Sequence, residues 1–272
     1  MQENVIHQFE NLPTGKPHVS FSELKEWQDC SYRHKLRHID GIDLSEPSPI
    51  LDFGTSVHSA CEDFLKTRIL KKEIASNLLK DLFEKQIGNA TYTDSLYSSY
   101  VNELTATLEE LPAFMELNFP NWETVDAEHF LYEPVVNHNH AFKGFIDAVI
   151  KVKDKKGQDQ YWLLDWKTTS WGWATQKKSD FKMHQQLIFY KNFWCNKTGV
   201  DPKNVRCGFV LLKRTAKTGN KCELVKVSVG DVTTSRALKS LGGMLTSVKK
   251  GMAIKNRDSC TYCAFKNTQH CT

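Results

Sequence analysis

The sequence predicts an α/β protein. Three observations support this class. Apolar residues recur at helical spacing across the N-terminal half. Two runs rich in Val, Ile, Phe, Tyr and Trp, Ala141–Val152 and Tyr161–Thr169, then read as strands joined by a Lys/Asp/Gly hairpin loop. After one further helical pattern, two more strand-like runs follow at Val205–Lys213 and Cys222–Val229. The order of elements that the sequence supports is therefore helices, a strand cluster, one helix and two more strands.

The N-terminal half is expected to be mostly helical. Met1–Val19 contains Pro and Gly without a clear period and is expected to be an irregular arm or a short lead-in strand. Ser20 or Ser22 can cap a helix that begins near Glu23. Further helical patterns cover Phe53–Leu70, Glu73–Gln86 and Ser95–Asn118.

The C-terminal half carries the remaining elements. A strand is expected at Phe130–Val136, directly before the hairpin. Phe181–Lys197 reads as a helix, and Val232–Lys249 as a final one. Nothing in the pattern divides the chain into independent units, so a single domain over residues 1–272 is expected.

Composition sets broad limits on function. The chain has 272 residues, 40% of them hydrophobic, and a formal net charge of +4, which is compatible with a polyanionic partner without requiring one. It has no apolar run long enough for a transmembrane helix and no signal-peptide pattern at its start, so a cytoplasmic protein is expected. In that compartment its eight cysteines are expected to be thiols or metal ligands rather than disulfides.

Three charged residues lie inside the apolar hairpin. Asp147 is at the centre of the first strand, and Asp165 and Lys167, two apart and therefore on one face, end the second. If the strands pair with Asp147 near Asp165, two carboxylates and an ammonium converge. A charge in an apolar strand is costly unless it is paired or binds a cation. The residues alone leave two alternatives, a structural ion pair and a site for a hard metal ion.

Three motifs in order carry a family resemblance. They are Gly144–Asp147 (GFID), Asp165–Thr168 (DWKT) and Gln186–Tyr190 (QLIFY). Together they resemble the PD-(D/E)xK nuclease superfamily, and within it the RecB-like branch. Gly54-x-x-x-His58 is similar to the motif that opens such domains. The resemblance implies a restriction-endonuclease-like mixed central sheet flanked by helices. Residues 53–120 would form a helical insertion and residues 130–230 the catalytic core.

The resemblance also implies roles. His58, Asp147, Asp165 and the main-chain carbonyl of Trp166 would bind one or two Mg²⁺ or Mn²⁺ ions, and Lys167 would orient or help to deprotonate the attacking water. Glu133, Gln186 and Tyr190 would assist the metal or position the phosphate. For His58 the alternative is an ordinary histidine on a helix, and for Glu133 an exposed acid on an edge strand.

Four cysteines form a second pattern. Cys260 and Cys263 are spaced as C-x-x-C, and Cys271 is the last residue but one. With Cys30 they resemble the iron–sulfur nucleases of the RecB-like branch, among them CRISPR-associated adaptation exonucleases and AddB-type nuclease domains. A 4Fe-4S cluster would then tie residues 20–40 to residues 255–272. Seven residues separate the last two cysteines where five are usual, so His270 is an alternative ligand. Zn²⁺ is an alternative occupant, and unligated thiols are a third interpretation.

The resemblance implies a function. We expect a metal-dependent deoxyribonuclease, an exonuclease on single-stranded DNA, in a bacterial, archaeal or virus-infected cell. Recombination or CRISPR adaptation proteins, or a second copy of the chain, are candidate partners. The alternative function is a non-catalytic DNA-binding or scaffold subunit with the same fold and a structural zinc or iron–sulfur site.

Overall fold

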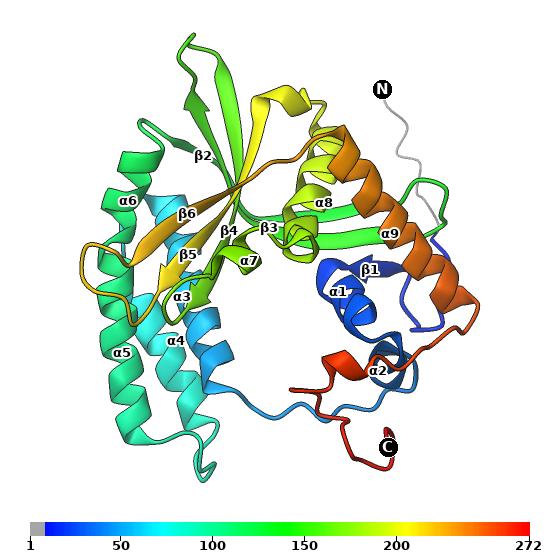
Figure 1. The fold of residues 1–272 in the computed structure, drawn as a ribbon. Helices are drawn as coiled ribbons and strands as arrows, with labels where there is room; N and C mark the ends of the chain where they lie inside the picture. Colours follow the sequence, from blue (N-terminus) through cyan, green and yellow to red (C-terminus); the bar gives the residue numbers. More distant parts are fainter. Residues whose placement is uncertain (1–8) are drawn as a thin grey trace.

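The sheet at the centre of the molecule has six strands and is mixed (Figure 1). The computed structural model describes residues 9–272. Five strands follow one another in the order β1-β3-β4-β5-β6, and β2 pairs with β3. The β1–β3 and β4–β5 pairs are parallel, and the other pairs are antiparallel. The strands are β1 (His18–Ser20), β2 (Glu123–Pro134), β3 (Ala141–Lys153), β4 (Asp159–Thr169), β5 (Val205–Lys213) and β6 (Cys222–Val227).

β3 is the strand that organises the sheet. β2 pairs with one of its edges from Ala141 to Lys151. β1 and β4 therefore share the other edge, β1 along Ala141–Lys143 and β4 along Ala148–Lys153. The segment Gly144–Asp147 lies between them, and neither β1 nor β4 pairs with it. One edge of β3 is thus open at the first of the three sequence motifs.

Helices cover both faces of the sheet. Four of them pack on one face, at the left in Figure 1: α3 (Pro49–Thr67), α4 (Lys72–Glu84), α5 (Asp94–Glu109) and α6 (Leu111–Asn118). The other face carries α1 (Phe21–Asp29), α8 (Phe181–Thr198) and α9 (Asp231–Lys249). Short helical turns complete the described chain: α2 (Ser31–His34), the π-turn η1 (Lys35–Ile39), α7 (Thr175–Lys178), η2 (Pro202–Asn204) and η3 (Arg257–Ser259).

Two hydrophobic cores lie on the two faces of the sheet. The first contains Phe142, Phe189 and Leu241, beneath α8 and α9. The second contains Phe53 and Leu104, beneath the helices α3–α6. Burial of apolar surface on both faces is what holds helices on each side of the sheet.

The expected α/β class, with a mixed central sheet flanked by helices, is confirmed. Several boundaries differ from the expected elements. The helix expected over Ser95–Asn118 is divided at Glu110 into α5 and α6. The helix from Glu23 is interrupted at Cys30, whose extended backbone (φ −161°) separates α1 from α2. The strand expected from Phe130 begins seven residues earlier, at Glu123, because its first half is held by pairing with β3, which local composition does not reveal.

Within residues 9–272, none of the helices combines the length and the apolar character that a bilayer crossing requires.

Candidate active site

The site lies where the side chains of β2 and β3 change the face of the sheet to which they point. Leu131, Phe142 and Ile146 pack in the core beneath α8, whereas Ala127 and Ala148 pack in the core on the opposite face. Since residues an even number apart share a face in a regular strand, the alternation must reverse between these positions. Glu128 and Asp147 lie at that reversal, and Glu128 has a left-handed backbone (φ 54°). Such strain in a non-glycine residue is typical of functional sites.

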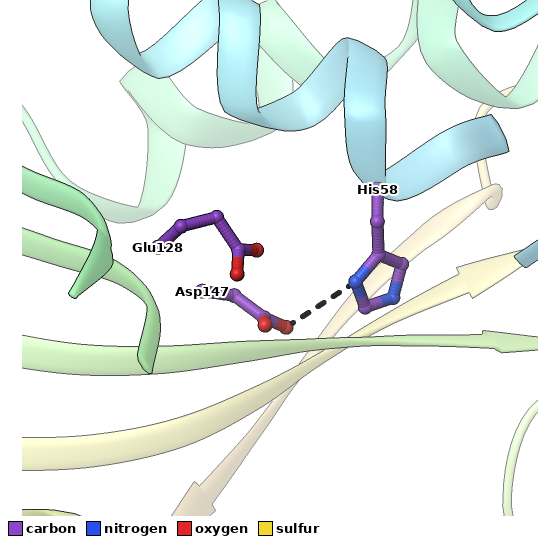
Figure 2. A group of neighbouring side chains, drawn as sticks. All are labelled: His58, Glu128 and Asp147. Atoms are coloured by element: carbon purple, nitrogen blue, oxygen red, sulfur yellow. Dashed lines mark ion pairs between the residues drawn. The ribbon is translucent and has the colours of Figure 1, made fainter. Parts of the chain in front are cut away.

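His58, Glu128 and Asp147 converge beside the open edge of β3 (Figure 2). One ligand atom from each lies within 4.8 Å of the others. Nδ1 of His58 is 3.6 Å from Oδ2 of Asp147. The main-chain carbonyl of Trp166 accepts a hydrogen bond from the His58 ring. The expected neighbours His58, Asp147 and the Trp166 carbonyl are therefore together.

His58 reaches this place because α3 packs closely on β4. A side-chain carbon added at Gly54, one helical turn before His58, would lie 3.2 Å from Oγ1 of Thr168. The small residue lets the helix approach the end of β4. The Gly54–His58 spacing thus has a packing reason as well as a chemical one.

Asp165 and Lys167 lie next to this group. Nζ of Lys167 is 2.6 Å from Oδ2 of Asp165, which is 2% exposed as a residue. The parallel pairing of β4 with β5 fixes the positions of both residues, with Asp165 opposite Phe209 and Lys167 opposite Leu211. Asp165 is not one of the three residues whose ligand atoms meet at His58. It contributes its charge to the same surroundings.

The electrostatics favour a cation at this place. Burial, and after it the Asp165 carboxylate, raises the pKa of Asp147 well above its usual range. Burial also raises the pKa of Glu128, with smaller contributions from Glu62 and Asp165. Burial lowers the pKa of His58, which keeps the imidazole neutral and able to donate its lone pair. Buried acids that repel one another and a neutral imidazole form a donor set that fits Mg²⁺ or Mn²⁺.

Gln186 and Tyr190 reach the site from α8. Nε2 of Gln186 donates to the Tyr190 hydroxyl at 3.1 Å, and Oε1 of Gln186 is buried without a hydrogen-bond partner in residues 9–272. A side-chain carbon added at Gly144 would lie 2.9 Å from Cε1 of Tyr190. The glycine of the first motif therefore makes room for the tyrosine of the third. The three motifs are packed against one another.

Glu133 lies apart from the metal group. It pairs across the sheet with Phe142, and its carboxylate is 3.3 Å from Nζ of Lys197. The acid of this strand that reaches the group is Glu128, which sequence reasoning did not single out. The available signal was its place on the strand before GFID, but the pattern put the start of that strand after it.

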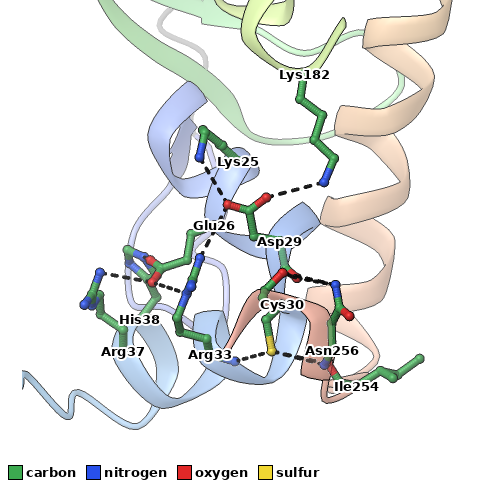
Figure 3. A network of polar contacts seen from close by, with 11 residues as sticks. Lys25, Glu26, Asp29, Cys30, Arg33, Arg37, His38, Lys182, Ile254 and Asn256 are labelled. Atoms are coloured by element: carbon green, nitrogen blue, oxygen red, sulfur yellow. Dashed lines mark hydrogen bonds and ion pairs between the residues drawn. The ribbon is translucent and has the colours of Figure 1, made fainter. Parts of the chain in front are cut away.

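The four cysteines of the second pattern come together at one small cavity. Cys30, Cys260, Cys263 and Cys271 all line it. The other four, Cys61, Cys195, Cys207 and Cys222, lie in the two cores or pack against them. Cys30 connects the ends of the chain: its sulfur accepts from the main-chain N–H groups of Arg33 and Asn256, each at 3.4 Å (Figure 3).

Comparison with known proteins agrees with this geometry. Residues 18–268 match the model of the PD-(D/E)XK nuclease superfamily. No curated protein matches the sequence significantly.

Two solved structures match most of the chain. A crystal structure named "Putative exonuclease" from Eubacterium rectale is 13% identical and superposes with a TM-score of 0.58, covering 98% of this chain and 93% of that one. The structure of a protein called SSO0001, also 13% identical, covers 90% of this chain and 92% of its own, with a TM-score of only 0.34. The family match spans almost the whole chain, and the protein therefore belongs to the PD-(D/E)XK nuclease superfamily.

Proposed function

We propose that the protein is a Mg²⁺- or Mn²⁺-dependent deoxyribonuclease that shortens single-stranded DNA from an end. The observation that carries the proposal is the convergence of His58, Glu128 and Asp147 beside the Asp165–Lys167 pair. These groups come from α3 and from the consecutive strands β2, β3 and β4, and they meet at the open edge of β3.

The proposed metal ligands are His58, Glu128, Asp147, Asp165 and the carbonyl of Trp166. A divalent ion bound there would lower the pKa of a water molecule and offset negative charge at the phosphate. Trp166 also holds Asp147, since its main-chain N–H donates to Oδ2 of Asp147 at 2.7 Å. That bond fixes the direction of the carboxylate.

Lys167 is proposed to position the attacking water and to neutralise charge that develops on the phosphate. Its ammonium is held at 2.6 Å by Asp165 and is a quarter exposed, so it can reach solvent and substrate. Removing one preorganised donor from such a site typically costs two to three orders of magnitude in rate.

Gln186 and Tyr190 are proposed to bind phosphate oxygens. Burial, and after it the Asp165 carboxylate, raises the pKa of Tyr190, so that its hydroxyl keeps its proton and can donate it. The amide of Gln186 has its free oxygen in the same place and can receive a proton from a water molecule or a sugar hydroxyl. Glu133 is retained as a more distant group that positions Lys197.

The exonuclease activity and the preference for single strands are the finer parts of this proposal. The E. rectale relative carries an exonuclease name, and its fold matches over nearly all of both chains. The preference for single strands is what the resemblance of the three sequence motifs to the RecB-like branch implies.

We further propose that Cys30, Cys260, Cys263 and Cys271 hold a 4Fe-4S cluster that links the α1–α2 junction to the C-terminal tail. Cys30 lines one small cavity from the α1–α2 junction, and Cys260, Cys263 and Cys271 line it from the tail. This shared lining is the observation that supports the proposal.

The experiment that tests the function uses protein purified without oxygen. Its visible spectrum and metal content are recorded first, and then end-labelled single-stranded DNA is incubated with Mn²⁺ or with EDTA. Stepwise shortening with Mn²⁺ alone supports the proposal. A colourless, zinc-containing protein without activity would favour the scaffold function instead.

A further inference from the structure

A strip of exposed and partly exposed aromatic side chains runs along β2 and β3 toward the metal group. Phe130 is paired with Phe145, and Tyr132 with Lys143, so these four side chains share one face of the sheet. Phe130 and Phe145 are each 45% exposed. Their ring centroids are 5.1 Å apart, and the ring of Tyr132 stacks on that of Phe130 at 6.0 Å.

This strip ends at the proposed active site. Two residues beyond Phe130 on β2 is Glu128, and two beyond Phe145 on β3 is Asp147. Two residues of a strand span about 7 Å, so the backbone positions of the rings lie close to those of the two carboxylates, even though the facing of both strands changes at Glu128 and Asp147. Large exposed rings are unusual on a soluble surface and mark a binding face when they are contiguous.

Cationic groups border the strip on its β1 side. Ser20 pairs with Lys143, which places His18 and Ser20 of β1 beside β3. Lys16 and Lys143 both lie near enough to His18 to lower the pKa of its imidazole, in addition to the larger effect of burial. Neither lysine has an ion-pair partner among residues 9–272, unlike Lys197, which is bound to Glu133.

A cavity joins the strip to the phosphate-binding residues. It has a volume of about 430 Å³, and its lining includes Lys16, Lys143 and Phe145 together with Gln186 and Tyr190. A cavity of this size is within the range of small-molecule sites and can hold a nucleotide. Because the edge of β3 is open at Gly144–Asp147, residues of α8 and residues of the strip can line the same cavity.

We propose that this strip, defined as Phe130, Tyr132 and Phe145 with Lys16 and Lys143 at its border, binds unpaired bases of the DNA strand that enters the active site. The inference rests on the proposed nuclease function and names the feature of the substrate that is recognised. Aromatic rings stack on the faces of bases, and the free ammonium groups attract the phosphates. In a duplex the base faces are covered by neighbouring pairs, so this surface selects single strands.

Binding is measured separately from cleavage, in EDTA, by fluorescence anisotropy. The probes are labelled oligo(dT) and an abasic oligomer of the same length, which has the same charge and no bases. The variant Phe130→Ala/Phe145→Ala is compared with Phe145→Leu, which keeps apolar volume, and with Phe130→Tyr/Phe145→Tyr, which keeps the rings. Leu117→Ala, at an 80% exposed position on α6, is the matched control.

The expected result is selective. The double alanine variant and Phe145→Leu bind oligo(dT) at least about fivefold more weakly, the ratio for one lost stacked base, and bind the abasic oligomer as the wild type does. The tyrosine variant and Leu117→Ala bind both probes normally. Lys16→Ala and Lys143→Ala lower the affinity for both probes and reduce the dependence of that affinity on salt concentration.

Equal affinity of wild type and ring variants for oligo(dT), or an equal loss for both probes, would overturn the inference. A change in sedimentation of the ring variants with unchanged DNA affinity would also overturn it, because the strip would then be a contact between protein chains. Failure of the nuclease proposal is a different result: wild-type protein that binds oligo(dT) and cleaves nothing with Mn²⁺.

Discussion

The main-chain N–H of Trp166 donates to Oδ2 of Asp147 at 2.7 Å, just past the last paired residues of β3 and β4, Ala148 and Leu164. The side chain of Asp147 thus takes the place of the next ladder hydrogen bond. β3 and β4 separate at this point, and the site opens between them. The same interaction that ends the ladder orients the central carboxylate of the metal group.

Asp165→Ala or Lys167→Ala is expected to abolish cleavage and preserve the fold. Asp165 repels Asp147 and holds the Lys167 ammonium at 2.6 Å, so its loss removes one unfavourable and one favourable contact, and the metal-free protein should melt close to the wild type. We expect a rate loss on the order of 100-fold or more. Rates on end-labelled DNA and thermal melting by circular dichroism measure the two effects.

The ion pair between Lys153 and Asp159, 2.5 Å apart near the hairpin end of the same two strands, supplies the control. Lys153→Ala and Asp159→Ala remove an exposed pair, which typically contributes little to stability. Both should cleave at the wild-type rate. Normal cleavage by Asp165→Ala or Lys167→Ala would remove those residues from the mechanism.

Gly144→Ala is expected to destabilise the protein. The added carbon would lie 2.9 Å from Cε1 of Tyr190, whose ring is buried in the core beneath α8. Such overpacking typically costs about 1–3 kcal/mol, and displacement of Tyr190 should slow cleavage as well. Urea denaturation measures the first effect.

Gly243→Ala, in α9, is the comparison, since nothing lies within 4 Å of its added carbon. Alanine in a helix interior is favoured over glycine by about 1 kcal/mol, so this variant should be as stable as the wild type or more so. If Gly144→Ala behaved like Gly243→Ala, close packing would not be the reason for glycine in the first motif.

Much of this arrangement could be predicted from local sequence. The hairpin, Asp147 near Asp165, and Gln186 with Tyr190 on one helix follow from strand and helix periodicity, because those residues lie inside long regular elements. Glu128 could not be found in this way. Its backbone leaves the regular strand conformation, and its position is set by pairing with β3, a contact distant in sequence.

Glu133 illustrates the same limit. It is an acid on the strand expected before GFID, whereas Glu128, five residues earlier, precedes the expected start of that strand, so the local pattern favours Glu133. Only the register, which puts Glu133 opposite Phe142, separates it from Asp147. A family resemblance transfers a residue type and an element, but the register decides which acid reaches the site.

Glu128→Gly and Glu128→Ala are expected to be equally defective in cleavage but unequal in stability. Both lose a carboxylate of the metal group, which should raise the Mn²⁺ concentration needed for activity. Because the position has a φ of 54°, glycine fits it without strain and alanine does not, a difference of about 1 kcal/mol. Mn²⁺ titration of the rate and urea denaturation check the two parts.

Asn137 is the matched position. It lies in the turn after β2 with a φ of 63°, and it is not one of the three residues of the metal group. Asn137→Gly should again be more stable than Asn137→Ala, and both should cleave normally. Equal stability of the two Glu128 variants would mean that the left-handed backbone is not required there.

The cysteines should divide into two classes in native labelling with iodoacetamide at pH 8. Burial raises the pKa of Cys195 to about 11 and that of Cys207 and Cys222 to about 12, and it raises the pKa of Cys61 as well. These four remain thiols and should not react, because the thiolate is the nucleophile. Cys30, Cys260, Cys263 and Cys271 are partly exposed and should react in protein stripped of metal. Peptide mass spectrometry identifies the labelled sites.

If the four partly exposed cysteines bind one cluster, reconstitution with iron and sulfide should protect all of them together. Protection of Cys260 and Cys263 alone would exclude Cys30 and Cys271 as ligands. The two ends of the domain would then be joined by hydrogen bonds without a cluster, among them those between residues 29–32 and Ile254, Asn256, Ser259 and His270.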